Sequence, residues 1–97
     1  MEYSEYKRNL LNAIETRAKC DAVYVQTQPV KYSLDGKTLW RGKVEVYQLK
    51  EHPQAKQAFG WGYSTSNGKI EYVTVIGVPP LDTPLAAVKG FVASIKK

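Results

Sequence analysis

The alternation of apolar and polar residues divides the chain into six segments. A helix is predicted over residues 3–19, because apolar residues recur three and four positions apart there. These residues are Tyr3, Tyr6, Leu10, Leu11, Ile14 and Ala18. A second helix is predicted from Pro84 onward, where Leu85, Val88, Val92 and Ile95 follow the same spacing. Asp82 or Thr83 can cap it, and proline suits a first helical position.

Between the helices, four segments are rich in β-branched and aromatic residues, which is typical of strands. They are residues 22–32, 38–49, 58–65 and 70–78. Asp35-Gly36 and Asn67-Gly68 each predict a tight hairpin turn. Pro29 predicts a bend or an edge position, because proline cannot donate a hydrogen bond to a ladder.

These elements predict an α+β fold in the order α-β-β-β-β-α, with the strands forming an antiparallel meander. The most economical packing places both helices on one face of the sheet, which makes two layers. The other face would then have no cover and would carry the function. We expect one domain spanning residues 1–97, because this length suits a single core.

The third strand places Phe59, Trp61 and Tyr63 on one face, opposite the small residues Ala58, Gly60 and Gly62. The large side chains form core if they face the helices, which alternating apolar residues usually do. Small residues also permit a helix to approach closely, and that would turn the rings outward. Outward rings could stack nucleic-acid bases beside Arg41, Lys43 and Lys69, or form a dimer face.

Charge and composition narrow the class of protein. The formal net charge is +5, which favours attraction to polyanions such as nucleic acid. One cysteine, Cys20, excludes a disulfide within the chain. The first residues carry acids where a signal peptide carries bases, and no apolar run is long enough to span a bilayer. We therefore expect a cytoplasmic protein without a membrane partner.

Basic residues are densest around the first hairpin, where Asp35 is the only acid among Lys31, Lys37, Arg41 and Lys43. The functional interpretation is a hairpin that contacts phosphates. The alternative is a solvated hairpin whose lysines protect exposed edges. The full set of candidate residues for binding nucleic acid or a partner is Lys31, Lys37, Arg41, Lys43, Trp61, Tyr63 and Lys69.

His52 is the only histidine, and it lies in a polar connection beside Glu51. No partner set for catalysis or for metal binding accompanies it, so we expect no catalytic residue, no metal and no cofactor. A structural or solvent-facing role is favoured, although His52 is the best single candidate if a pocket exists. Cys20 is expected to be a small buried apolar residue.

Two resemblances concern parts of the chain. The element order resembles that of double-stranded-RNA-binding domains, which have three strands, a loop histidine that reaches into the minor groove and a basic start to the last helix. Here His52 lies between strands, but the last helix begins DTPLAA and a fourth strand is predicted. The runs GKVEVY (42–47), HPQAKQAFGW (52–61) and VPPLDTPLAAV (78–88) are similar to a group of small uncharacterised bacterial proteins, which implies no function.

The leading functional expectation is a non-catalytic binding module that binds nucleic acid through a basic and aromatic sheet face. The alternative is a homo-oligomeric or protein-interaction domain that uses the uncovered face, with a homodimer as the simplest form. An enzyme is the least favoured class, because polar groups suited to chemistry are few and scattered.

Overall fold

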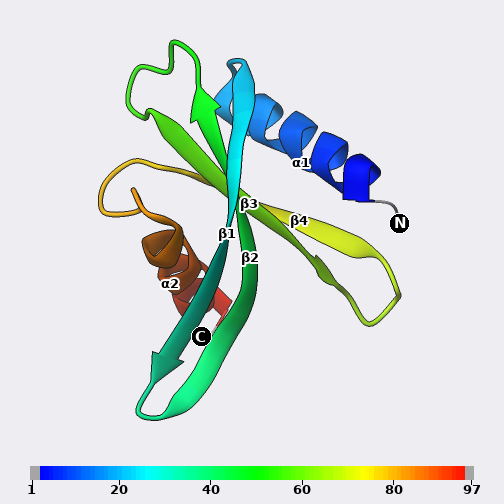
Figure 1. Cartoon of the computed structure of the whole chain (residues 1–97), viewed down its shortest axis with the longest axis vertical. Helices are drawn as coiled ribbons and strands as arrows, with labels where there is room; N and C mark the ends of the chain where they lie inside the picture. Colours follow the sequence, from blue (N-terminus) through cyan, green and yellow to red (C-terminus); the bar gives the residue numbers. More distant parts are fainter. Residues whose placement is uncertain (1–2, 96–97) are drawn as a thin grey trace.

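The computed structural model describes residues 3–95, with side chains described for residues 5–94. It contains helix α1, four strands and helix α2 (Figure 1). Their bounds are α1 Tyr3–Ala18, β1 Ala22–Leu34, β2 Lys37–Leu49, β3 Gln57–Ser64, β4 Ile70–Ile76 and α2 Pro84–Ile95. The strands form one antiparallel sheet in the order β1-β2-β3-β4. The predicted α+β class, element order and meander are therefore confirmed.

Both predicted hairpin turns are present. Asp35 and Gly36 have φ angles of 53° and 77° between β1 and β2, where two positive values match the right-handed twist of the strands. Gly68, with φ 77°, donates its N–H to the carbonyl of Thr65 in the β3–β4 turn. Glycine reaches these angles without a steric penalty, so the two turns follow directly from the sequence.

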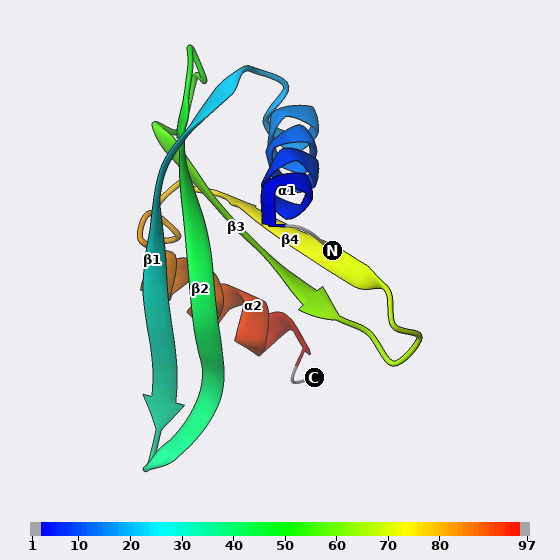
Figure 2. The ribbon, with the colours of Figure 1, turned by 45° about the vertical axis from the view of Figure 1, so that its right-hand side comes forward.

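The two hairpins overlap over a short stretch only. β1 and β2 are paired along their whole length, whereas β2 pairs with β3 from Glu45 to Gln48 alone. The rest of the first hairpin projects past β3 as a two-stranded ribbon (Figure 2). We call residues 28–44 the arm.

The two helices cover opposite faces of the sheet, so the prediction that they share one face is wrong. A Cβ built on Gly60 would lie 2.7 Å from Leu10 Cδ1 of α1, which shows that α1 lies on the glycine side of β3. The neighbouring Phe59 and Trp61 point the other way, into a cluster with Val88 of α2. In Figure 2, α1 and α2 lie on either side of the β3–β4 hairpin.

Each helix has its own core. The α1 core is built on Leu10, Ile14, Ala18, Ala22, Tyr47, Leu49, Ala55 and Ala58. The α2 core is built on Val30, Val44, Val46, Phe59, Trp61, Ala87, Val88 and Val92. The two cores form because small and large side chains alternate along β3. The small residues let α1 approach the backbone, and the large residues fill the space between β3 and α2.

The start of α2 matches its predicted capping. Thr83 Oγ1 accepts a hydrogen bond from the N–H of Ala86 at 3.1 Å, and Pro84 occupies the first helical position. Within the helix, Val88 and Val92 are buried as expected, but Leu85 is 41% exposed. The side chain of Ile95 lies outside the described residues.

The close approach of α1 predicts that β3 does not tolerate a branched side chain at position 60. Gly60→Val should lower the free energy of unfolding by about 1–3 kcal/mol, the usual cost of overpacking a core. Urea unfolding followed by circular dichroism measures this. Ser64→Val places the same branched side chain at an exposed position of the same strand and should change stability by less than about 0.5 kcal/mol. Equal stability of the two variants would contradict the contact between α1 and β3.

Candidate functional site

One face of the arm collects three of the predicted basic residues. Lys31 of β1 is directly opposite Arg41 of β2, and Pro29 is opposite Lys43. Directly opposite residues share a face of a sheet, as do residues two apart on one strand. Lys31, Arg41 and Lys43 therefore project from the same side, and all three are exposed. We call them the basic face.

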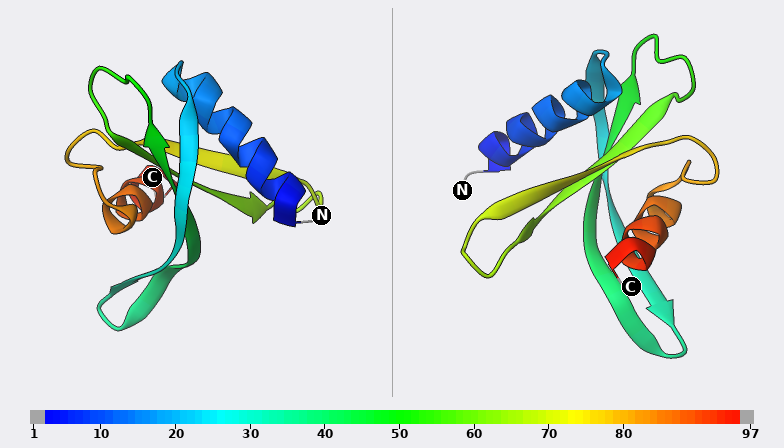
Figure 3. Two further views of the ribbon diagram at one scale, coloured as in Figure 1. Left: turned by 45° about the horizontal axis from the view of Figure 1, so that its top comes forward. Right: turned by 180° about the vertical axis from the view of Figure 1, so that it is seen from behind.

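The basic face lies on the side of the sheet that carries α1, but α1 ends short of it. α1 packs on β3, β4 and the first part of β1, while the arm extends away from the helix (Figure 3). On its other side, the arm is anchored to the α2 core by Val30 and Val44. The arm is thus held from one side and presents its cations from the other.

The basic face ends at a buried acid. Glu45 follows Lys43 on the same side of β2 and is 1% exposed. Its carboxylate accepts a hydrogen bond from the Thr27 hydroxyl, which is also 2.6 Å from the hydroxyl of Tyr24. Lys7 of α1 stacks over the Tyr24 ring at 3.8 Å. Glu45 therefore belongs to a network between β1, β2 and α1.

The alternation along β2 places Glu45 on this face but carries no information about its burial. The carboxylate accepts a hydrogen bond from Thr27, a residue of the neighbouring strand β1. The strand position of Thr27, opposite Glu45 in the register, is what makes this bond possible. Register between β1 and β2 was the missing information.

The other predicted binding residues do not join the basic face. Lys37 lies at the tip of the arm, where β2 begins. Trp61 is 2% exposed in the α2 core, with its ring centroid 5.4 Å from that of Trp40 and 5.5 Å from that of Phe91. Tyr63 is 45% exposed but lies on the α2 side of the sheet, and Lys69 lies in the β3–β4 turn. Trp61 is thus core, and the expected aromatic platform beside the basic residues is not formed.

His52 organises the connection between β2 and β3. Its Nδ1 accepts hydrogen bonds from the N–H groups of Gln54 and Ala55, at 3.1 and 3.0 Å. Nδ1 accepts in these bonds, so the neutral ring carries its proton on Nε2. The favoured structural interpretation of His52 agrees with this geometry.

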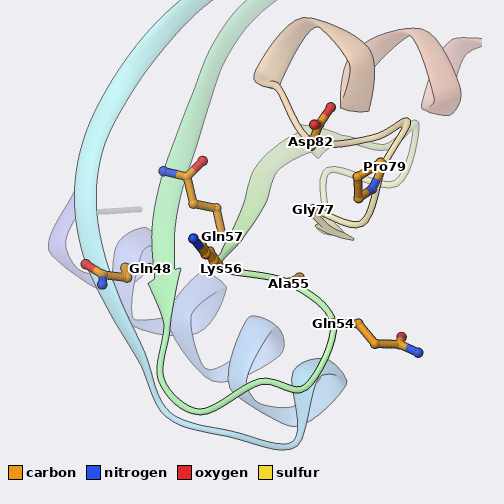
Figure 4. Close-up of a pocket in the computed structure, with 8 residues that line it drawn as sticks. All are labelled: Gln48, Gln54, Ala55, Lys56, Gln57, Gly77, Pro79 and Asp82. Atoms are coloured by element: carbon orange, nitrogen blue, oxygen red, sulfur yellow. The ribbon is translucent and has the colours of Figure 1, made fainter.

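A shallow hollow lies beside this connection (Figure 4). Its lining residues are Gln48, Gln54, Ala55, Lys56, Gln57, Gly77, Pro79 and Asp82. His52 is not among them, although it lies in the loop that supplies three of them, Gln54, Ala55 and Lys56. The side chain of Gln54 points away from the hollow, while Asp82 and Lys56 come from opposite sides of it (Figure 4). The lining therefore offers amides and single charges without a converging pair suited to acid–base chemistry.

The acidic residues and Cys20 are the remaining candidates for metal or thiol chemistry. Within residues 5–94, no group of three His, Cys, Asp or Glu side chains is arranged to hold a metal ion. Cys20 is half-buried at the end of α1, against the α1 core. The expectation of a buried residue is therefore met only in part, because Cys20 packs against this core but keeps some exposed surface.

Comparisons with known proteins identify no relative of this chain. No family model matches the chain, and no curated protein or solved structure matches it. Among the described helices, none is both long enough and apolar enough to cross a membrane. The likeness to double-stranded-RNA-binding domains stays at the level of element order, because His52 is used within its own loop.

The geometry of His52 predicts that this loop depends on an acceptor at position 52. His52→Ala should lower the free energy of unfolding by roughly 1–2 kcal/mol, because two backbone donors lose their partner. His52→Asn should recover much of this loss, since its side-chain oxygen can accept in place of Nδ1. Gln54→Ala, in the same exposed loop, is the control and should be nearly neutral. A urea midpoint for His52→Ala equal to that of the wild type would show that the hydrogen bonds contribute nothing.

Proposed function

We propose that the chain is a non-catalytic module that uses Lys31, Arg41 and Lys43 to bind the phosphate backbone of nucleic acid. The observation that carries this proposal is the pairing of Lys31 with Arg41 directly across the two strands. Like charges in that position destabilise a sheet. A bound polyanion removes this repulsion, because each phosphate neutralises a cation.

The surroundings of the basic face favour contacts to the phosphates of nucleic acid over contacts to its bases. Glu45, the acid next along β2, is buried and hydrogen-bonded to Thr27, so it does not project among the three cations. Trp61, the strongest candidate for stacking, is buried on the other side of the sheet. Because the three residues of the basic face carry charge and no aromatic ring, binding rests on charge and depends little on base sequence.

The hydrogen bonds that His52 and Glu45 already make within the protein support a non-catalytic module. His52 Nδ1 accepts two backbone N–H groups, and the Glu45 carboxylate accepts from Thr27. A general base needs its lone pair directed toward a substrate. In His52 and Glu45, the lone pairs that accept these hydrogen bonds point at groups of the protein itself.

The proposal predicts salt-dependent binding that fails when the basic face is neutralised. A fluorescent DNA duplex should bind at low salt, with about three to four phosphate contacts from the arm. A fourfold rise in salt should then weaken binding roughly hundredfold, because each neutralised phosphate adds about −0.9 to the slope of log K against log salt. The triple variant Lys31→Gln, Arg41→Gln, Lys43→Gln should lower the magnitude of that slope by about 2–3. Fluorescence anisotropy across a salt series measures both effects.

A matched control separates the basic face from net charge. Lys50→Gln, Lys56→Gln and Lys69→Gln together remove the same three charges from exposed positions outside the arm. This variant should retain most of the affinity and most of the slope. Equal losses in the two triple variants would reject the arm as the site. Undetectable binding of duplex and single-stranded DNA or RNA at low salt would reject the function.

A further inference from the structure

The outer side of β4 presents hydrogen-bonding groups that no strand in the described part of the chain uses. Thr65 donates to the carbonyl of Lys69, and Gly77 donates to the carbonyl of Gln57, at the two ends of the β3–β4 ladder. Because hydrogen-bonded positions alternate along an antiparallel strand, Val73 bonds to β3 and Thr74 directs its N–H and C=O outward. Tyr72 and Ile76 share the outward direction of Thr74, and the carbonyl of Ile76 also accepts a hydrogen bond from the N–H of Val78 at 2.8 Å.

The two edges of the sheet differ in how they are protected. β1 carries Pro29, Lys31 and register irregularities at Tyr24/Gln26 and Tyr32/Ser33, all of which hinder the addition of another strand. β4 pairs with β3 in a regular register and has no proline. Its one charge, Glu71, lies near its start. β4 is therefore the edge suited to pairing.

Side chains on both faces form a groove along β4. Seen from behind (Figure 3, right), β4 runs between α1 and α2. Its lining includes Arg17, Val73, Thr74, Val75, Ile76 and Phe91. Most of this lining is apolar, and Thr74, Val75 and Ile76 are half-buried. An added strand would cover apolar surface as well as satisfy the backbone.

We propose that β4 pairs antiparallel with β4 of a second copy of this chain, about a twofold axis at Thr74. In this register Thr74 faces Thr74 of the second copy, and their outward N–H and C=O groups form two mutual hydrogen bonds. Tyr72 faces Ile76, and Val73 faces Val75. The two sheets become one continuous sheet of eight strands with an isologous interface.

The sequence of β4 favours its own copy as the occupant. A Thr–Thr pair and an aromatic–β-branched pair are among the favourable cross-strand combinations, and this register produces both. It also places Glu71 opposite the uncharged Gly77 of the second copy, so the one acid of the strand does not meet itself. The Glu71 of the second copy lies at the Ile76 end of β4, the end nearer the last turn of α1, where Arg17 lines the groove.

A charge exchange at position 74 tests both the pairing and its register. Wild-type protein should be dimeric in sedimentation experiments, with a fraction of dimer that rises with concentration. Thr74→Lys alone, and Thr74→Glu alone, should each weaken the dimer by roughly fivefold or more, because like charges meet across the axis. A mixture of the two variants should form heterodimer, since the introduced lysine of one chain then meets the introduced glutamate of the other. Salt should partly restore each homodimer by screening the repulsion.

Two control variants test whether the effect on the dimer is specific to a charge on β4. Thr74→Val keeps a neutral β-branched side chain and should leave the dimer intact. Val25→Lys introduces the same charge on the exposed β1 edge, where Val25 is 47% exposed, and should also leave it intact. A wild type that stays monomeric at every concentration overturns the proposal. So does a dimer that dissociates with Val25→Lys but not with Thr74→Lys, or variants that fail to recombine when mixed.

Discussion

The alternation of small and large side chains along β3 is the constraint on which the rest of the structure depends. Gly60 and Gly62 leave the backbone bare on one side, so α1 approaches until the Tyr6 hydroxyl accepts a hydrogen bond from the N–H of Gly62 at 2.7 Å. On the other side, Phe59 and Trp61 fill the space between β3 and α2. One strand thus offers a bare backbone to α1 and a row of large side chains to α2, and each helix packs on the surface that its side offers.

The sequence predicted the elements and turns well, because these depend on local chemistry. Hairpin glycines, the Thr83 cap and the spacing of apolar residues act within a few positions. The side of the sheet that each helix occupies is a long-range property, and helical periodicity carries no information about it. The glycines and the rings of β3 were treated as competing helix-facing rows, whereas each faces its own helix.

The candidate site also combines features that the sequence predicts with features that depend on the tertiary fold. Lys31, Arg41 and Lys43 were identified from their density, and parity alone places Arg41 and Lys43 on one face. The burial of Trp61 and Glu45 could not be derived in this way. Trp61 is buried because α2 lies on its side of the sheet, and Glu45 is buried because α1 and the register with Thr27 enclose it. Both results require the tertiary arrangement.

The short ladder between β2 and β3 has a mechanical consequence. Four residue pairs join the two hairpins, whereas twelve join β1 to β2 and seven join β3 to β4. Backbone hydrogen bonds therefore make each hairpin stiff but leave the joint between them compliant, and the hairpins cross at a wide angle there (Figure 1). The crossing angle is set by the side chains wedged on either side of the joint. A small change of volume in either core would rotate one hairpin against the other and leave both ladders whole.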